Sequence, residues 1–448
     1  MNPEFQRNLW LEIPTSRLIA MPAVLLLAFL AAWLAGGDSL VAPAALLAIV
    51  ALLILWGSRL AAESVLREVA ANTWDTQRMS SVGAWNMAWG KLYGGTAFVW
   101  YGALWCSVIY LTTPEPHLLP LTRLLLAGLQ VQGLALLFSL MLLRHEPESL
   151  HFHVIASQTA AIMAVVPILV KATAPGNIDG EVVWFGVGVP SPAFLFFSQI
   201  AFLLWTMVGL YRLMRIELNY RPGPQATWLL FALFLASYIS GFDDLFSTSA
   251  GSHAVGDALE TRAFTTFCVF TVLTYVAAFI EPKNIVRLRR WAELIASGNV
   301  MRSLDIAPSW AFSAALTYLL AIGSLVHLLL LPTADRALPE EIARFVIAIA
   351  LFVTRDVAML YAFVLQDRLR RGHIAALVCL IMLYFILPVM LNAVHLDFLI
   401  PVFLPSANTS TAVTVAPIAI QAVFAVSFTL RRWRGIRTPD DRSQQTHH

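Results

Sequence analysis

The sequence predicts an all-α membrane protein, a bundle of helices that crosses a lipid bilayer many times. Of its 448 residues, 59% are hydrophobic and only 12% are charged, whereas soluble domains are about 45–50% apolar and about 25% charged. Many apolar runs reach or approach the length of about 20 residues that a helix needs to cross the hydrocarbon core. A helix satisfies its own backbone hydrogen bonds, so it is the structure expected of such runs in lipid.

Apolar runs bounded by charged residues, Pro and Gly define about 12 candidate spans. They are Leu18–Leu34, Leu40–Trp56, Thr96–Leu111, Leu124–Leu143, Val154–Val170, Ala193–Leu210, Trp228–Gly241, Ala263–Ile280, Ala311–Leu331, Ile342–Leu365, Ile374–Val394 and Val413–Leu430. Between the fifth and sixth spans, the segment Ala172–Ser191 is rich in Gly and Val and is expected to form a small turn or hairpin outside the membrane.

The spans fall into two halves of about six helices each, residues 1–222 and residues 223–448. Each half has a long polar loop between its second and third spans, at residues 57–95 and 281–310. Internal repeats are common in transporters. The matching positions of the two loops therefore favour a duplicated plan.

The distribution of Lys and Arg sets the predicted orientation. Most of the 29 basic residues lie in alternate loops, and such loops stay in the cytoplasm. We expect a bacterial inner-membrane protein with both termini in the cytoplasm. The few basic residues in outer loops are Arg123, Lys171, Arg262, Arg336 and Arg344.

Charge and cysteine usage exclude several function classes. A net charge of +2 gives no bulk electrostatic support for a nucleic-acid partner. Cys106, Cys268 and Cys379 lie inside apolar runs without a CxxC or Cys/His grouping. They are interpreted as packing thiols, and no metal site is expected.

The loop at residues 57–95 carries the most information. Its start is Ala-rich and amphipathic, and it extends the second helix to about Ser80, where Ser80-Ser81-Val82-Gly83 breaks the pattern. A new helical stretch then leads into the third span. Trp85 and Trp89 share one face of this stretch and suit the headgroup level, with Lys91 expected to snorkel nearby.

This loop resembles that of the permease subunits of type-2 ATP-binding-cassette exporters. In that family the loop between the second and third helices carries an acidic and a basic residue, then G-T-W-D or G-T-x-E, a Ser/Thr turn, and G-K-L. The matching residues are Arg67, Glu68, Thr73, Trp74, Asp75, Ser80, Gly90, Lys91 and Leu92. The chain departs from the pattern at Asn72, where the family usually has Gly, and at Gln77-Arg78, where it usually has Leu.

The resemblance implies that the loop is a coupling element, a short helix that seats in a groove of a separate cytoplasmic ATPase subunit. Trp74 would be the aromatic anchor, with Asp75 and Arg78 registering against the partner. The full set of coupling candidates is Arg67, Glu68, Thr73, Trp74, Asp75, Arg78, Trp85 and Lys91. The alternative interpretation is that Trp74 and Trp85 are interfacial belt residues beside a solvated loop.

The chain itself lacks an ATPase motif. The nearest P-loop lookalike, Gly83 to Gly90-Lys91, has six residues between its glycines where four are required, and Leu92 stands where Ser or Thr should bind magnesium. ATP and magnesium are therefore expected on the partner subunit. The chain is expected to be a transport subunit without enzyme activity or a cofactor of its own.

Family members typically have six helices and pair as dimers. About twelve predicted spans leave open a homodimer or a pseudo-dimer within one chain. The second loop carries the basic run Arg287-Leu-Arg289-Arg290-Trp291 without a T-W-D equivalent. If it is a second coupling site, it has degenerated.

Acidic and basic residues within or beside spans are candidates for a substrate pathway or gate. Arg355 and Asp356 lie near the middle of the tenth span. Adjacent residues diverge by about 100° on a helix, so each is expected to face a neighbouring helix. Asp243 and Asp244 follow the seventh span. The structural alternatives are a polar clamp for the first pair and a solvated loop for the second.

These patterns support three function classes. The leading interpretation is the permease subunit of an exporter of a lipidic or amphipathic substrate, driven by the partner ATPase. The second is an ion-coupled, twelve-helix secondary transporter that uses Arg355, Asp356 or Asp243. The third is a membrane-embedded enzyme that acts on a lipid-linked substrate, a class that usually has acidic residues on an outer loop near the first helix, where this chain has Asp38 alone.

Overall fold

The computed structural model describes residues 2–114, 116–143, 150–173, 180–220, 225–242, 255–281, 283–330, 337–365, 372–404 and 411–435. The chain divides into two compact units, Met1–Gly223 and Pro224–His448. This division falls beside the boundary between residues 222 and 223 that the order of spans indicates. Each unit has hydrophobic clusters of its own.

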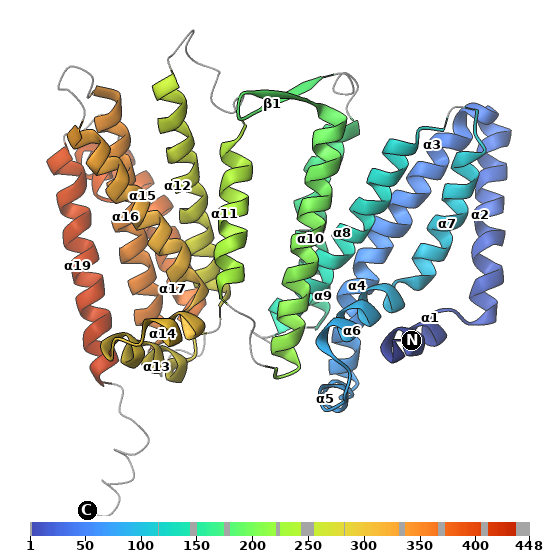
Figure 1. The fold of residues 1–448 in the computed structure, drawn as a ribbon, viewed down its shortest axis with the longest axis horizontal. Coiled ribbons are helices and arrows are strands. Elements are labelled where there is room, and N and C mark those ends of the chain that lie inside the picture. Colours follow the sequence, from blue (N-terminus) through green and yellow to red (C-terminus); the bar gives the residue numbers. More distant parts are fainter. Residues whose placement is uncertain are drawn as a thin grey trace, which may run out of the picture. The chain divides into compact units, whose positions relative to one another are not determined.

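The described part of the first unit is helical apart from one hairpin (Figure 1). Its elements are α1 (Pro3–Glu12), α2 (Thr15–Gly36), α3 (Asp38–Ile49), η1 (Val50–Trp56), α4 (Gly57–Ala70), α5 (Trp74–Arg78), α6 (Ala84–Trp89), η2 (Gly90–Gly94), α7 (Ala97–Leu111), α8 (Leu118–Leu143), α9 (Leu150–Thr173), β1 (Glu181–Trp184), β2 (Val187–Pro190) and α10 (Ser191–Glu217).

In the described part of the second unit every regular element is a helix. The elements are α11 (Ala226–Ser240), α12 (Val255–Ile280), α13 (Ile285–Ala296), α14 (Val300–Ile306), α15 (Ser309–Leu330), α16 (Ala337–Val364), α17 (Gly372–Ile381), η5 (Met382–Ile386), α18 (Leu387–Ala393), η6 (Asp397–Val402) and α19 (Thr411–Gly435).

The described helices include nine that are long and apolar enough to cross a membrane, or ten if a bent pair counts as one span. An all-α, multi-pass membrane protein is therefore supported, but the count of about 12 is not confirmed. The bent pair, Ala84–Gly94 with Ala97–Leu111, turns by 54°. The two other predicted spans correspond to the shorter apolar helices Phe152–Val165 and Ala226–Ser240.

The second predicted span continues without a break into the predicted loop. Helices α3, η1 and α4 together run from Asp38 to Ala70, and η1 is a π-helical turn. A π turn frees backbone carbonyls from the α-helical ladder. Gln132 on α8 donates its amide to the carbonyl of Leu53 at 3.1 Å, and Gln158 on α9 donates to Leu55 at 2.8 Å. These bonds satisfy groups that would be costly to leave unpaired in lipid.

The predicted hairpin is confirmed at residues 181–190. Strands β1 and β2 pair antiparallel, with Trp184 opposite Val187. Phe185 and Gly186 form the turn with φ values of 50° and 75°. Positive φ at both central residues matches the right-handed twist of the strands.

Two glycines leave room for helix α1 to pack closely against the start of the bent span. A Cβ atom on Gly90 would lie 2.6 Å from the Glu4 Cγ and 2.9 Å from the Phe5 backbone nitrogen. A Cβ atom on Gly94 would lie 2.7 Å from the Asn8 Cβ. Because one helical turn separates the two glycines, both open the same face of the helix to α1.

We expect Gly90→Ala to displace α1, because its Cβ would meet the α1 backbone as well as a side chain. The purified protein should melt at a lower temperature, and limited proteolysis should cut α1 faster. Gly83→Ala is the matched control, since a Cβ there meets nothing within 4 Å. Equal behaviour of the two variants would show that α1 does not depend on this close approach.

Candidate coupling site

The loop that the sequence singles out forms a folded elbow, called the first elbow here and defined as residues 71–89. It starts where α4 ends. Asn72 has φ of 55°, the Asn72 amide donates to the Val69 carbonyl at 3.1 Å, and the Thr73 amide donates to the Glu68 carbonyl at 2.9 Å. This pair of bonds is a Schellman motif, which needs a left-handed residue, usually Gly and sometimes Asn. The departure from the family pattern at Asn72 is therefore conformationally conservative.

Trp74 lies in the core of its own unit, which corrects its predicted role as an anchor exposed to a partner. The side chain is 4% exposed and belongs to a cluster with Leu66 and Met87. A ring with so little exposed surface cannot seat in a groove of another protein while the elbow keeps this conformation. The belt interpretation of Trp74 fails for the same reason, because a belt residue must reach the headgroups.

Lys91 is also buried, although the sequence suggests a lysine that snorkels to the membrane surface. It lies in η2 and is 1% exposed. Its ammonium group is 2.9 Å from a carboxylate oxygen of Glu4 and 2.9 Å from the Gln77 side-chain oxygen, and it forms a further ion pair with Glu68. A lysine ammonium has three N–H donors. The three partners use all of them.

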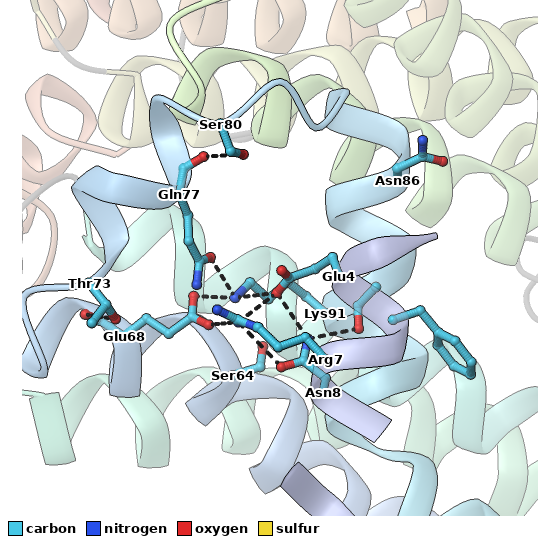
Figure 2. A network of polar contacts seen from close by, with 12 residues as sticks. Glu4, Arg7, Asn8, Ser64, Glu68, Thr73, Gln77, Ser80, Asn86 and Lys91 are labelled. Carbon is cyan, nitrogen blue, oxygen red and sulfur yellow. Dashed lines mark hydrogen bonds and ion pairs between the residues drawn. The ribbon is translucent and has the colours of Figure 1, made fainter. Parts of the chain in front are cut away.

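Arg7 completes this cluster, called the Lys91 network and consisting of Glu4, Arg7, Glu68, Gln77 and Lys91 (Figure 2). The Arg7 guanidinium pairs with Glu4 at 2.8 Å and also with Glu68. Two cations thus face two carboxylates, so the charges in the network balance. The network joins α1, α4, α5 and η2, and Figure 2 shows their side chains converging on Lys91.

The Trp74 ring adds a second contact to the same lysine. The Lys91 ammonium lies 5.5 Å from the ring centroid, within the range of a cation–π interaction. The Trp74 indole nitrogen and the Gln77 side-chain nitrogen have no hydrogen-bond partner among the described residues. Trp74 therefore packs within its own chain, where its ring lies beside the buried Lys91 ammonium.

Arg78 ties α5 to the end of α10. Its Nε donates to the backbone carbonyl of Glu217 at 2.7 Å, and its Nη2 lies 3.3 Å from the Glu217 carboxylate. Glu217 is 6% exposed. Arg78 also lies 3.4 Å from Asp75. Its guanidinium therefore makes contacts within its own chain, whereas the sequence predicts that it contacts a partner.

The remaining coupling candidates are more exposed. The side chain of Asp75 is 85% exposed, and Met79, which the sequence did not single out, is 81% exposed. Trp85 is 45% exposed and packs edge-on against Trp89 at 5.2 Å. Asp75, Met79 and Trp85 are thus among the exposed residues of the first elbow.

Arg67 and Thr73 support the elbow from its sides. Arg67 is 55% exposed and pairs with Glu63 and, at 3.5 Å, with Glu12 of α1. The Thr73 hydroxyl donates to the Glu68 carbonyl at 3.2 Å.

Sequence reasoning missed Glu4, Arg7 and Glu217 because they lie far from the loop in the chain. For Glu4 and Arg7, the only signal in the sequence was that an acidic and a basic residue lie together in a short amphipathic segment before the first span.

A second polar cluster lies within the second unit. Arg355 and Asp356 are 4% and 1% exposed, and the Arg355 Nε donates to Asp356 at 2.8 Å. Asp356 also accepts hydrogen bonds from the hydroxyls of Tyr275 at 2.7 Å and Tyr384 at 2.5 Å. The expectation that each residue faces a neighbouring helix holds, but the two also pair with each other, because their long side chains bend toward one another.

Arg355 makes further contacts across the bundle. Its Nη1 donates to the Gln421 side-chain oxygen on α19 at 2.7 Å, and its guanidinium lies 4.6 Å from the Phe352 ring centroid. The cluster therefore joins α12, α16, η5 and α19, and the buried Arg355 Nη2 is left without a hydrogen-bond partner among the described residues.

The other predicted pathway residues, Asp243 and Asp244, lie outside the described residues. Within the described part of the chain, no three His, Cys, Asp or Glu side chains gather in a way that could hold a metal ion.

Comparison of the chain with protein-family models, curated proteins and solved structures finds no match. The geometry is therefore the guide to function.

We expect Lys91→Met to destabilise the protein by about 3–5 kcal/mol, because Glu4 and Glu68 then share the single positive charge of Arg7. Thermal unfolding of the purified protein measures the effect. Adding Glu68→Gln to Lys91→Met should recover part of the loss.

Arg59→Ala is the control for this substitution. The Arg59 side chain is 63% exposed in its pair with Glu63, and an exposed pair contributes about 0–1 kcal/mol. A Lys91→Met variant no less stable than Arg59→Ala would show that the network does not hold the elbow together.

Proposed function

We propose that this chain is the permease subunit of an ATP-driven exporter. A separate cytoplasmic ATPase subunit would supply ATP and magnesium and would dock on the first elbow. The substrate class that the family resemblance implies is lipidic or amphipathic. The chain itself would provide the membrane path and no enzymatic step, in one copy or as part of a dimer.

The observation that carries this proposal is the Lys91 network. It links α5, which has an exposed outer surface, to the start of a span that bends by 54° immediately afterwards. Lys91 is 1% exposed, and it is bound to Gln77 of α5 by a hydrogen bond and to Glu68 of α4 by an ion pair. Breaking buried polar contacts is costly, so a push on α5 would move η2 with it. This is the mechanical property that a coupling element needs.

The docking surface we propose differs from the one that the sequence suggests. Asp75, Met79 and Trp85 are exposed, whereas Trp74, Glu68 and Lys91 are internal. An exposed Met and Trp beside a carboxylate suit an interface with an adaptable apolar centre and a charged rim. Trp74, Glu68 and Lys91 would act in coupling by transmitting movement, and Arg67, Thr73 and Arg78 by supporting the elbow.

We expect a photo-crosslinking amino acid at position 79 to capture a P-loop ATPase in cells that make this protein. Mass spectrometry of the crosslinked product identifies the partner. The control places the same amino acid at Trp33, which is 52% exposed at the end of α2. Capture of the same proteins at both positions, without a nucleotide-binding protein enriched at 79, would refute docking on the first elbow.

A second candidate function is ion-coupled transport through the Arg355 and Asp356 cluster. This function is favoured by the buried ion pair of Arg355 and Asp356 in a span. It is also favoured by the Arg355 Nη2, which has no hydrogen-bond partner among the described residues. Such pairs often mark ion pathways. Against it stands the complete set of partners around Asp356, which suits a clamp between helices.

We expect Asp356→Asn to lower the melting temperature of the purified protein, because it leaves Arg355 buried without its counter-charge. Replacing both residues, with Arg355→Gln and Asp356→Asn, should restore part of the stability, as is usual for a structural pair. Functional residues are often kept at a cost in stability. An Asp356→Asn variant as stable as the native protein, or more stable, would therefore favour the ion pathway.

A further inference from the structure

The second unit has its own elbow between membrane spans, called the second elbow here and defined as residues 281–309. It contains α13 and α14 and connects the end of α12 to the start of α15. In Figure 1 it lies at the same end of the second unit as the end of α19. That end of α19 carries Arg432 and Arg434.

The second elbow has a defined fold of its own. Arg287 donates from Nε to the Ile306 carbonyl at 3.0 Å and from Nη2 to the Ala307 carbonyl at 2.9 Å. Its Nη1 lies 2.9 Å from Glu281, and the second Glu281 oxygen accepts from the Ser309 amide at 2.6 Å. Arg287 and Glu281 thus fix α13 and α14 to both adjoining spans. Burial raises the pKa of Glu281 above its usual range, although Arg287 opposes this shift.

Helix α13 is the most amphipathic described helix of ten residues or more. Leu288, Trp291 and Ile295 share one face by their three- and four-residue spacing. None of the residues of α13 is buried, and Ile295 is 52% exposed. Leu288 and Trp291 are half-buried, so the apolar face of α13 is partly uncovered in the described structure, most clearly at Ile295.

Helix α14 adds exposed apolar side chains to the second elbow. Val300 is 62% exposed, Met301 is 80% exposed and Leu304 is 44% exposed. Only Ser303 of α14 is buried. So many large apolar side chains in a short segment exceed the scattered single residues that a soluble surface normally shows.

The apolar face of α13 lies beside the first turn of a span. Trp291 on this face contacts Trp310 edge-on at 6.4 Å, and Trp310 lies in the first turn of the span α15. The Trp310 indole donates to the Tyr361 hydroxyl on α16 at 2.7 Å. Two tryptophans and a tyrosine at the end of a bundle are typical of the interface between lipid and water.

Basic residues flank this face. Arg289 and Arg290 on α13 and Arg302 on α14 outnumber the acidic residues Glu293 and Asp305 of the two helices. A helix with a strong apolar face and a basic polar face is suited to lie in the plane of a membrane that contains anionic lipid. Long arginine side chains can bury their stems and keep their charge among the headgroups.

We propose that α13 and α14 form a membrane-surface hairpin that inserts its apolar side chains among the lipids of the leaflet on the basic side and binds anionic headgroups through its arginines. Both ends of the hairpin are attached to spans, so lipid is always within its reach. The proposal requires only that the chain spans a bilayer, and it is independent of any ATPase. It also accounts for the basic run without T-W-D, which then serves lipid in place of a coupling partner.

Spin labels test the proposal in the full chain. Ile295→Cys and Glu293→Cys are introduced singly after Cys106, Cys268 and Cys379 are replaced by Ala, labelled, and reconstituted in nanodiscs of zwitterionic lipid with about one third phosphatidylglycerol. Collisions with oxygen report lipid, and collisions with a water-soluble nickel complex report water. We expect the ratio of oxygen to nickel accessibility to be several-fold higher at position 295 than at position 293. In nanodiscs without phosphatidylglycerol, this difference should shrink.

Leu304→Cys provides a second probe on α14 if the change at position 295 disturbs the fold. A label at 295 and at 304 that is as accessible to nickel as the label at 293 would overturn the proposal. Immobile labels that neither oxygen nor nickel reaches would also overturn it, because they would show that protein covers this face. A difference that is unchanged by phosphatidylglycerol would refute the anionic part of the proposal.

Discussion

A lysine that is 1% exposed must be paired, and the first elbow is organised around this requirement. An uncompensated ammonium in a low-dielectric interior is so unfavourable that the fold must bring carboxylates to it. Glu68 comes from the end of α4 and Glu4 from α1, so α1 is fixed in place by the same charge that fixes the elbow. Gly90 and Gly94 then let α1 approach closely. The position of four segments thus follows from one buried charge.

Each elbow connects the second and third spans of its unit, but the two do so with different chemistry. In each unit a carboxylate near the end of the second span meets a group near the start of the third: Glu68 meets Lys91, and Glu281 meets the Ser309 amide. In the first unit α1 packs against α6 and η2, and the polar centre around Lys91 is internal. In the second unit α13 has no buried residue. We infer that the first elbow suits a protein partner and the second suits lipid, so similar positions in the chain need not share one role.

The sequence was sufficient for the fold class because lipid imposes a simple rule: apolar runs of span length become helices. It also located both elbows and the hairpin, where local turn chemistry dominates. It misplaced Trp74 and Lys91, because a Trp or Lys beside a span is equally compatible with the headgroup layer and with a buried network. The choice depends on Glu4 and Arg7, which are distant in the chain. The pairing of Arg355 with Asp356 was missed because helical geometry fixes the direction of Cβ atoms and leaves long side chains free to bend.

The Lys91 network also determines where movement in the first unit can be absorbed. The Lys91 ammonium is buried and joins η2 to α4 by its ion pair with Glu68 and to α5 by its hydrogen bond with Gln77. The segments α4, α5 and η2 therefore move together more easily than they separate. The adjacent hinge is different. The helix breaks at Gly95 and Thr96 with a bend of 54°, and a Cβ atom on Gly95 would meet only the Ser64 Cβ, at an ordinary contact distance of 3.4 Å. Glycine at a break can change its backbone angles at little steric cost. A displacement of α5 would therefore reach α7 as a change of this bend, with the elbow itself acting as a rigid body.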